Sequence, residues 1–285
     1  MAAAAIRVAG GGIPTPLPLA ISVGASIIIS TSFGAGDAKK ANHAFNLSLL
    51  IAAAASLLIA VFGNIYIHQL AAALGSTPDI QDEAVTYLWY IVTGSPFLIF
   101  SFAFSSYARA DNRPKLAMWA LAIGSASNIL LDYVFMYPLD MGIAGAALAT
   151  ALGPIFSVII LLPHFLRGKG MLRFAMPALS GKMAWTILLL GAPAFVMEFS
   201  IGIVTLFYNI CIGLSGLGGL GLAAYPDIGF ISLFITTLSL SLSHRLEPLI
   251  CFSHCTCKRR RSRASLLFIF NVVPVLGLFL YLHFS

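Results

Sequence analysis

Two oxygen-bearing side chains, Asn128 and Asp132, stand four residues apart inside the apolar segment NILLDYVF. On a helix they would share one face, about 40° apart and one turn from each other. Amide and carboxylate oxygens at this spacing suit a hard cation, and Thr150 in the next apolar segment offers a hydroxyl oxygen as a further ligand. The spacing therefore favours a cation site formed by Asn128, Asp132 and Thr150. The structural alternative is that Asp132 only caps its helix or reaches towards the membrane surface.

Glu198 begins a second polar stripe, with Thr205 seven and Asn209 eleven positions further on. On a helix the side chains of Thr205 and Asn209 each point within about 20° of Glu198. An acid inside a membrane helix is costly and usually functional. We expect Glu198, Thr205 and Asn209 to couple proton and substrate movement, because a proton and a cationic substrate would compete for one carboxylate. The structural alternative is a hydrogen bond between helices.

The cysteines do not predict a metal site. They are Cys211, Cys251, Cys255 and Cys257. The last three lie near two histidines, but their C-x3-C-x-C spacing matches no common zinc pattern and a basic run follows them. The sequence also carries no nucleophile elbow, phosphate-binding loop or dinucleotide fingerprint. We therefore expect no metal, no cofactor beyond a coupling ion, and no enzymatic activity.

The composition identifies the medium in which these residues work. The chain has 285 residues, of which 59% are hydrophobic and 9% are charged, and its mean hydropathy is +0.95. Soluble domains carry about 25% charged residues, so the composition excludes a soluble globular enzyme, a disordered chain and a disulfide scaffold. Because backbone exposed to lipid must satisfy its own hydrogen bonds, the sequence predicts an all-α polytopic membrane protein.

Eight apolar segments are long enough to cross a hydrocarbon core of about 30 Å as helices. They cover residues 17–36, 44–67, 85–108, 116–138, 141–164, 183–212, 222–243 and 264–284. Trp89, Trp119 and Trp185 each fall within the first residues of a segment. This position is typical of aromatic residues at the membrane interface.

Lys and Arg residues are concentrated in alternate loops. Every Lys and Arg except Arg7 lies after the first, third, fifth or seventh apolar segment. The other loops hold Asp79, Asp82, Glu83 and Asp140 but no Lys or Arg, and Asp227 lies near the outer start of the seventh segment. The positive-inside rule places the basic loops in the cytoplasm of a multi-pass plasma-membrane protein, as in a bacterial inner membrane. Topology thus explains the net charge of +6, and no nucleic-acid partner is expected.

An internal repeat predicts the domain organisation. Residues 32–51 and 253–272 both read as a helix end, a turn of small residues, a basic cluster and a new apolar helix. This pattern predicts six-helix half-units. The predicted parts are an irregular tail (1–16), a first bundle without its first helix (17–164), a cytoplasmic linker (165–182) and part of a second bundle (183–285).

Several segments, in this order and spacing, resemble the multidrug and toxic compound extrusion (MATE) family. They are GAGDAKKA (34–41), ARADNRPKLAM (108–118), NILLDYVF (128–135), MGIAGAALAT (141–150) and GAPAFVMEFS (191–200). The resemblance implies a twelve-helix fold of two pseudo-symmetric bundles that exports organic cations and amphipathic drugs in exchange for sodium ions or protons. It also implies that Asn128, Asp132 and Thr150 contribute to the cation site of the first bundle. Asp111 departs from the family, which usually has glycine there.

Three functional hypotheses follow. The first is a secondary active efflux transporter driven by an ion gradient, since the sequence has no ATP-binding motif; its partners would be a small xenobiotic and the bilayer. The second is a truncated or frame-damaged fragment without independent transport, because the first helix and last three helices of the family have no counterpart. The third, an intramembrane prenyl or lipid transferase, is disfavoured because its acidic cluster, Asp79, Asp82 and Glu83, lies on the outer side.

Overall fold

The computed structural model describes residues 16–73, 81–168, 170–175 and 179–214, and these segments are helical over most of their length. The helices are α2 (Pro16–Gly34), α3 (Ala38–Ile65), α4 (Ile67–Ala73), α5 (Gln81–Ala110), α6 (Pro114–Met136), α7 (Gly142–Leu166) and α8 (Gly181–Leu214). No strand occurs in these segments. The all-α class and the first six predicted spans are therefore confirmed, whereas the spans predicted at 222–243 and 264–284 lie outside the described residues.

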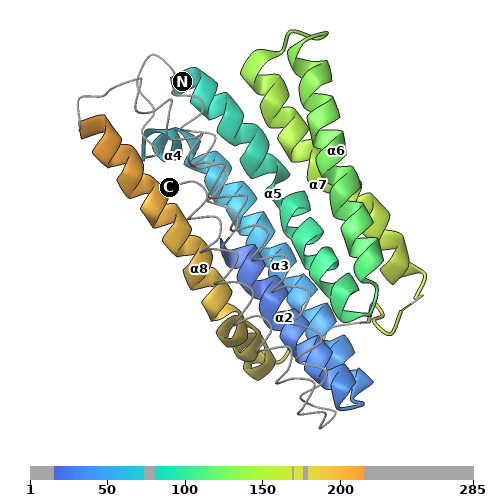
Figure 1. Ribbon diagram of the computed structural model, residues 1–285. Helices are drawn as coiled ribbons and strands as arrows, with labels where there is room; N and C mark the ends of the chain where they lie inside the picture. The colour runs from blue at the N-terminus through green and yellow to red at the C-terminus, as the bar shows by residue number, and fades with distance from the viewer. Residues whose placement is uncertain (1–15, 74–80, 169, 176–178, 215–285) are drawn as a thin grey trace, which may run out of the picture.

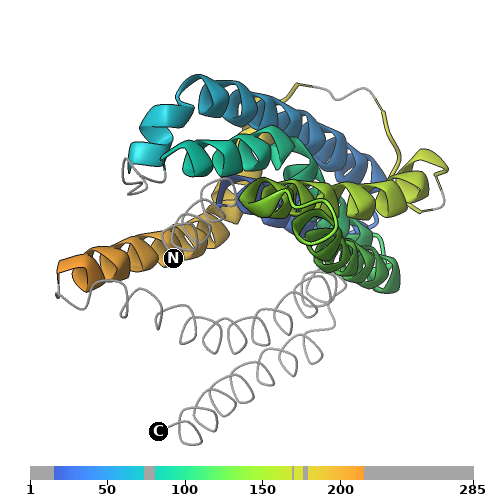
Figure 2. The same cartoon turned by 90° about the horizontal axis from the view of Figure 1, so that it is seen from above.

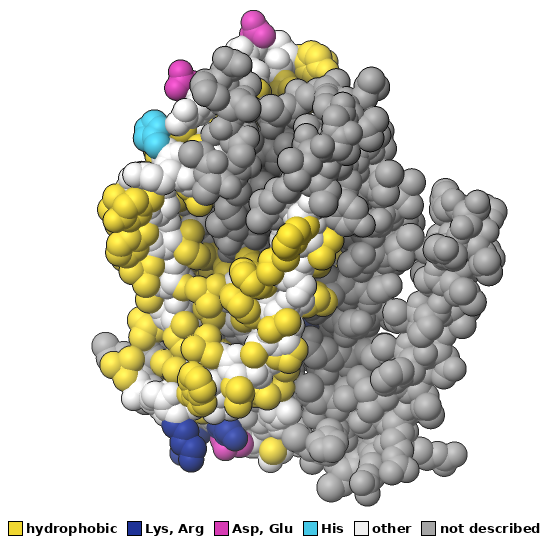
Figure 3. Space-filling model, turned by 90° about the vertical axis from the view of Figure 1, so that its left-hand side faces the viewer, with side chains coloured by type: hydrophobic (Ala, Val, Ile, Leu, Met, Phe, Trp, Pro, Cys, Tyr) yellow, Lys and Arg dark blue, Asp and Glu magenta, His cyan; other side chains and the backbone are white. Residues whose placement is uncertain are grey.

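Six of the helices, all except α4, are long and apolar enough to cross a membrane. The large side chains that they expose are mainly apolar, and the exposed fractions of Trp119, Ile129 and Trp185 are 60%, 70% and 68%. Figure 3 shows one face of the protein, on which hydrophobic side chains form a broad band with Lys and Arg side chains at one end. Such a band suits contact with lipid acyl chains, since only the ends meet water and headgroups.

Helix α4 was not predicted from the sequence. It has seven residues, too few to span a bilayer, and the hydropathy pattern merged its start with the preceding span. Ala71 of α4 is buried in a small cluster with Tyr87 and Leu88 of α5. Packing against α5, rather than any periodic apolar pattern of its own, therefore accounts for this short helix.

Helix α2 lies inside the bundle and is the most buried of the six long helices. It packs against α3, α5 and α8, whereas α6 pairs with α7, which packs on α5. Consequently α8 and the α6–α7 pair lie on opposite sides of the bundle (Figures 1 and 2). This arrangement separates the two stripes of polar residues that the sequence predicts.

The contact between α2 and α8 brings backbone against backbone at Gly24 and Gly191. A Cβ atom on Gly191 would overlap the carbonyl oxygen of Ala20, and one on Gly24 would overlap the carbonyl oxygen of Ile187. Small residues allow such close approach of membrane helices, where van der Waals packing and interhelical hydrogen bonds drive association. The crossing therefore depends on the absence of side chains at these two glycines.

Two short turns lie at one end of the bundle, as the sequence predicts. In the turn before α3, Gly36 has a φ of +78° and the Asp37 carboxylate accepts a hydrogen bond of 3.0 Å from the Lys40 amide. In the turn before α6, Asn112 has a φ of +59°, a conformation that asparagine tolerates better than most residues. Because these turns carry Lys39, Lys40, Arg113 and Lys115, we call this the basic end.

Aromatic rings join three helices near the basic end. The ring of Phe45 in α3 stacks on Phe165 of α7 at 5.4 Å and meets the edge of Tyr107 of α5 at 5.5 Å. The Tyr107 hydroxyl donates a buried hydrogen bond of 2.8 Å to Ser48 Oγ of α3. These contacts link α3, α5 and α7 to one another at the basic end.

Candidate functional site

Helix α6 carries Asn128 and Asp132 one turn apart, and both residues are half-buried. The Nδ2 atom of Asn128 is buried and makes no hydrogen bond within the described residues, and Oδ1 of Asp132 is buried as well. The buried amide of Asn128 calls for a partner such as an ion or water. Since the two ends of an amide are nearly the same shape, rotating the Asn128 amide places an oxygen where Nδ2 lies. The pair can therefore present two oxygen atoms to one cation.

Helix α7 approaches α6 closely beside Asn128. A Cβ atom built on Gly153 of α7 would lie 3.2 Å from the Cβ of Asn128 and 3.1 Å from the carbonyl oxygen of Gly124. Four residues further along α7, Ser157 Oγ donates a hydrogen bond of 3.0 Å to the Ala120 carbonyl. The α6–α7 interface thus fixes where Asn128 stands relative to α7.

Thr150 lies on α7, one turn before Gly153. Its hydroxyl donates to the Ala146 carbonyl of its own helix at 2.9 Å, so a lone pair remains for another partner. The structure therefore places all three predicted ligands on two adjacent helices that touch beside Asn128. Their binding of a cation stays a prediction.

Glu198 lies half-buried on α8, on the far side of the bundle from α6 (Figure 1). Thr205 and Asn209 lie on the same continuous helix, which confirms the helical spacing that the sequence predicts. Their side chains are outside the described ones. Glu198 and Asp132 accordingly belong to separate places in the protein, and a single shared site is excluded.

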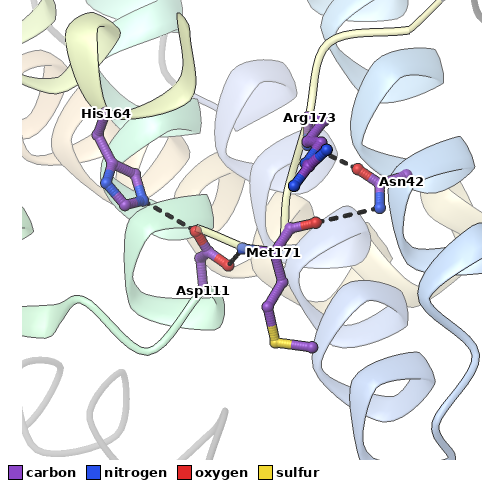
Figure 4. Close-up of polar contacts among 5 residues, drawn as sticks. All are labelled: Asn42, Asp111, His164, Met171 and Arg173. Carbon is purple, nitrogen blue, oxygen red and sulfur yellow. Dashed lines mark hydrogen bonds and ion pairs between the residues drawn. The ribbon is translucent and has the colours of Figure 1, made fainter. Parts of the chain in front are cut away.

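A second buried carboxylate was not identified as a working residue from the sequence. The side chain of Asp111, in the turn between α5 and α6, has no exposed surface. Its Oδ2 lies 2.8 Å from Nε2 of His164 in α7, and its Oδ1 accepts a 2.8 Å hydrogen bond from the Met171 amide (Figure 4). This contact joins the carboxylate to a ring nitrogen of His164, and its donor and acceptor depend on the His164 tautomer. The only hint in the sequence is an acid in a turn and a histidine in a last helical turn at the same end of the bundle.

No group of three or more His, Cys, Asp or Glu side chains within the described segments is placed to hold a metal ion. The cysteines at 251, 255 and 257 and the neighbouring histidines lie outside these segments. The prediction that this cluster binds no metal therefore stays a prediction.

Comparison with known proteins connects this arrangement to a transporter family. The MatE family model matches residues 1–134, which include Asn128 and Asp132. The multidrug export protein MepA of Staphylococcus aureus (strain bovine RF122 / ET3-1) is 26% identical over 242 residues, covering 84% of this chain and 53% of MepA. The chain is therefore similar to MATE transporters over this part of its length. It spans about half the length of the curated relatives that it matches.

Solved MATE structures have the same fold. A structure of the MATE multidrug transporter DinF-BH superimposes with a TM-score of 0.84 at 25% identity, covering 97% of this chain and 64% of that one. A MATE structure in complex with MaD5 gives a TM-score of 0.85 at 21% identity, covering 97% and 63%. The resemblance drawn from the sequence motifs is thus confirmed. The chain is a multi-pass protein of the plasma membrane with a MATE transporter fold.

Proposed function

We propose that the protein is a secondary active efflux transporter that exports organic cations or amphipathic drugs by antiport with sodium ions or protons. The observation that carries this proposal is the pair Asn128 and Asp132, one helical turn apart within a membrane span, with Asn128 packed beside Gly153 of α7. An intramembrane acid marks an ion pathway by default, because an uncompensated charge there is costly. The names of the relatives, a multidrug export protein and a multidrug transporter, support the substrate class.

The proposed coupling works through differential affinity. An ion changes a conformational equilibrium only by the difference between its affinities for the two states. A cation held between α6 and α7 would favour the state in which Asn128, Asp132 and Thr150 converge. Its release would favour the other state, and an ion gradient would thereby drive cycles of substrate export.

Glu198 is proposed as a second coupling residue, acting with Thr205 and Asn209 on α8. Its half-buried position leaves the carboxylate reachable, and its helix contacts α2 rather than the α6–α7 pair. A proton or a cationic substrate could each neutralise it, so the two would exclude one another. Coupling at Glu198 would therefore be of the proton type, and coupling at Asp132 of the cation type.

A transport assay in a pump-deficient bacterial host tests the proposal. Cells that make the chain are expected to accumulate less ethidium, a fluorescent organic cation, than cells with an empty vector. A protonophore or removal of external sodium is expected to abolish the difference, and whichever treatment does so identifies the coupling ion. Equal ethidium accumulation in both strains, with the chain present in the membrane by immunoblot, would refute the proposal.

A further inference from the structure

The connection between α7 and α8 runs across the basic end as an extended segment, residues 171–175, which we call the strap. The side chain of Leu172 is fully buried in the main hydrophobic core. The ring of Phe174 lies 5.4 Å from the ring of Phe45 in α3. The strap is therefore anchored by apolar contacts as well as by its polar ones.

Two asparagines of α3 bind the strap backbone as a neighbouring β-strand would. Asn42 accepts from the Arg173 amide at 2.6 Å and donates to the Met171 carbonyl at 3.2 Å (Figure 4). Asn46 accepts from the Ala175 amide at 2.9 Å and donates to the Arg173 carbonyl at 2.9 Å. Because Asn42 and Asn46 are one helical turn apart, they match the two-residue repeat of an extended chain.

Asp111 binds the remaining amide of this series, that of Met171, and His164 holds the other oxygen of the carboxylate. The fit is close at Gly170, because a Cβ atom there would overlap Oδ2 of Asp111 and lie 2.9 Å from Nε2 of His164. Every second amide of the strap thus has its own side-chain acceptor, and the acceptors come from two places in the fold: helix α3 and the α5–α6 turn.

We propose that residues 171–175 act as a cooperative strap that fastens the α7–α8 connection to the basic end and releases as one unit, with Asp111 as its fastening residue. The physical reason is shared entropy: once one contact has ordered this short segment, each further contact orders little more of the chain. Losing any one contact therefore weakens all the others. Leu172, between two of the bound amides, would leave the core in the same event.

Release would change how far α8 can move. With the strap docked, the connection from Ala175 to the start of α8 at Gly181 can span about 20 Å at most. With the strap released, the connection extends from Arg167, the C-cap of α7, and can span about 50 Å. This role in α8 movement rests on the proposed transport function, whereas the cooperative docking does not.

Hydrogen exchange at single-residue resolution on the full chain in detergent tests the cooperativity. In Asp111→Ala, the amides of Met171, Arg173 and Ala175 are all expected to exchange at least about tenfold faster than in the wild type. Independent hydrogen bonds would deprotect Met171 alone, and that result, or no change at any of the three amides, would overturn the proposal. The assay needs no transport, so its failure is distinct from failure of ethidium efflux.

A second variant and a matched control keep the test decisive. Gly170→Ala keeps the Asp111 side chain, but the added methyl group displaces its carboxylate from His164. Amide exchange should therefore become faster at Arg173 and Ala175 as well as at Met171. Asp37→Ala removes another carboxylate at the basic end, one whose bond is to the Lys40 amide, and should leave strap exchange unchanged. If Asp37→Ala speeds strap exchange as much as Asp111→Ala does, Asp111 is not the fastening residue.

Discussion

Gly191→Ala is expected to lower the thermal stability of the purified protein, and Gly202→Ala, on the same helix, is expected to raise it. A Cβ at position 191 would overlap the backbone carbonyl of Ala20 in α2, which cannot move aside as a flexible side chain could. The helices must then separate, and overpacking of this kind costs about 1–3 kcal/mol. At position 202 no described atom lies within 4 Å of the added Cβ, so the ordinary helix preference for Ala over Gly, about 0.5–1 kcal/mol, remains.

The measurement is the fraction of monodisperse protein that survives heating in detergent, followed by size-exclusion chromatography. The two substitutions are expected to change thermal stability in opposite directions, and this makes the comparison informative. A general effect of alanine on α8 would move the melting temperatures of both variants in the same direction. Gly24→Ala, on the other side of the crossing, should resemble Gly191→Ala. A Gly191→Ala protein as stable as the Gly202→Ala protein would show that α2 and α8 do not touch at this crossing.

Long apolar segments were predictable because one physical requirement determines them. A helix of at least about 20 apolar residues is needed to cross the bilayer, and the first six predicted spans agree with α2, α3, α5, α6, α7 and α8. Helix α4 was not predictable on this basis, because its seven residues are held by packing on α5. The predicted repeat at residues 253–272 lies outside the described part of the chain.

The candidate cation site was half predictable. The spacing of Asn128 and Asp132 sets their common face through helix geometry alone. Their approach to α7 depends instead on Gly124 and Gly153, whose pairing is a tertiary contact between helices. A glycine in a sequence does not show which helix packs against it. The burial of the site against α7 could therefore not be predicted from the sequence.

The strap could not be predicted, since its hydrogen bonds join positions 60 to 131 residues apart. Asp111 stood out in the sequence only as a departure from the glycine of the related family. Asn42 and Asn46 do share a helix face, and that spacing was a usable signal. This spacing predicts a polar face on the helix, but it does not predict which segment packs against that face.

Asp132→Asn is expected to reduce ion-coupled ethidium efflux to near the level of the empty vector. The substitution keeps the shape of the side chain and one oxygen but removes the charge that would bind the coupling ion. Interactions with a charged partner contribute about 1.5–3 kcal/mol, which corresponds to a loss of roughly 10- to 100-fold in ion affinity. Asn128→Ala should have a smaller effect, because it removes a neutral ligand. Raising the external ion concentration should partly restore efflux in both variants.

Asp140→Asn is the matched control, because it makes the same chemical change eight positions further along the chain. Asp140 is exposed in the turn between α6 and α7, with a φ of +47°, a conformation that asparagine also adopts readily. It should leave efflux unchanged. If the Asp132→Asn and Asp140→Asn proteins both export ethidium as well as the wild type, the proposal that Asp132 binds the coupling ion is wrong. Glu198→Gln then becomes the deciding variant, because a loss of efflux in that variant alone would move the coupling to α8 and make it proton-driven.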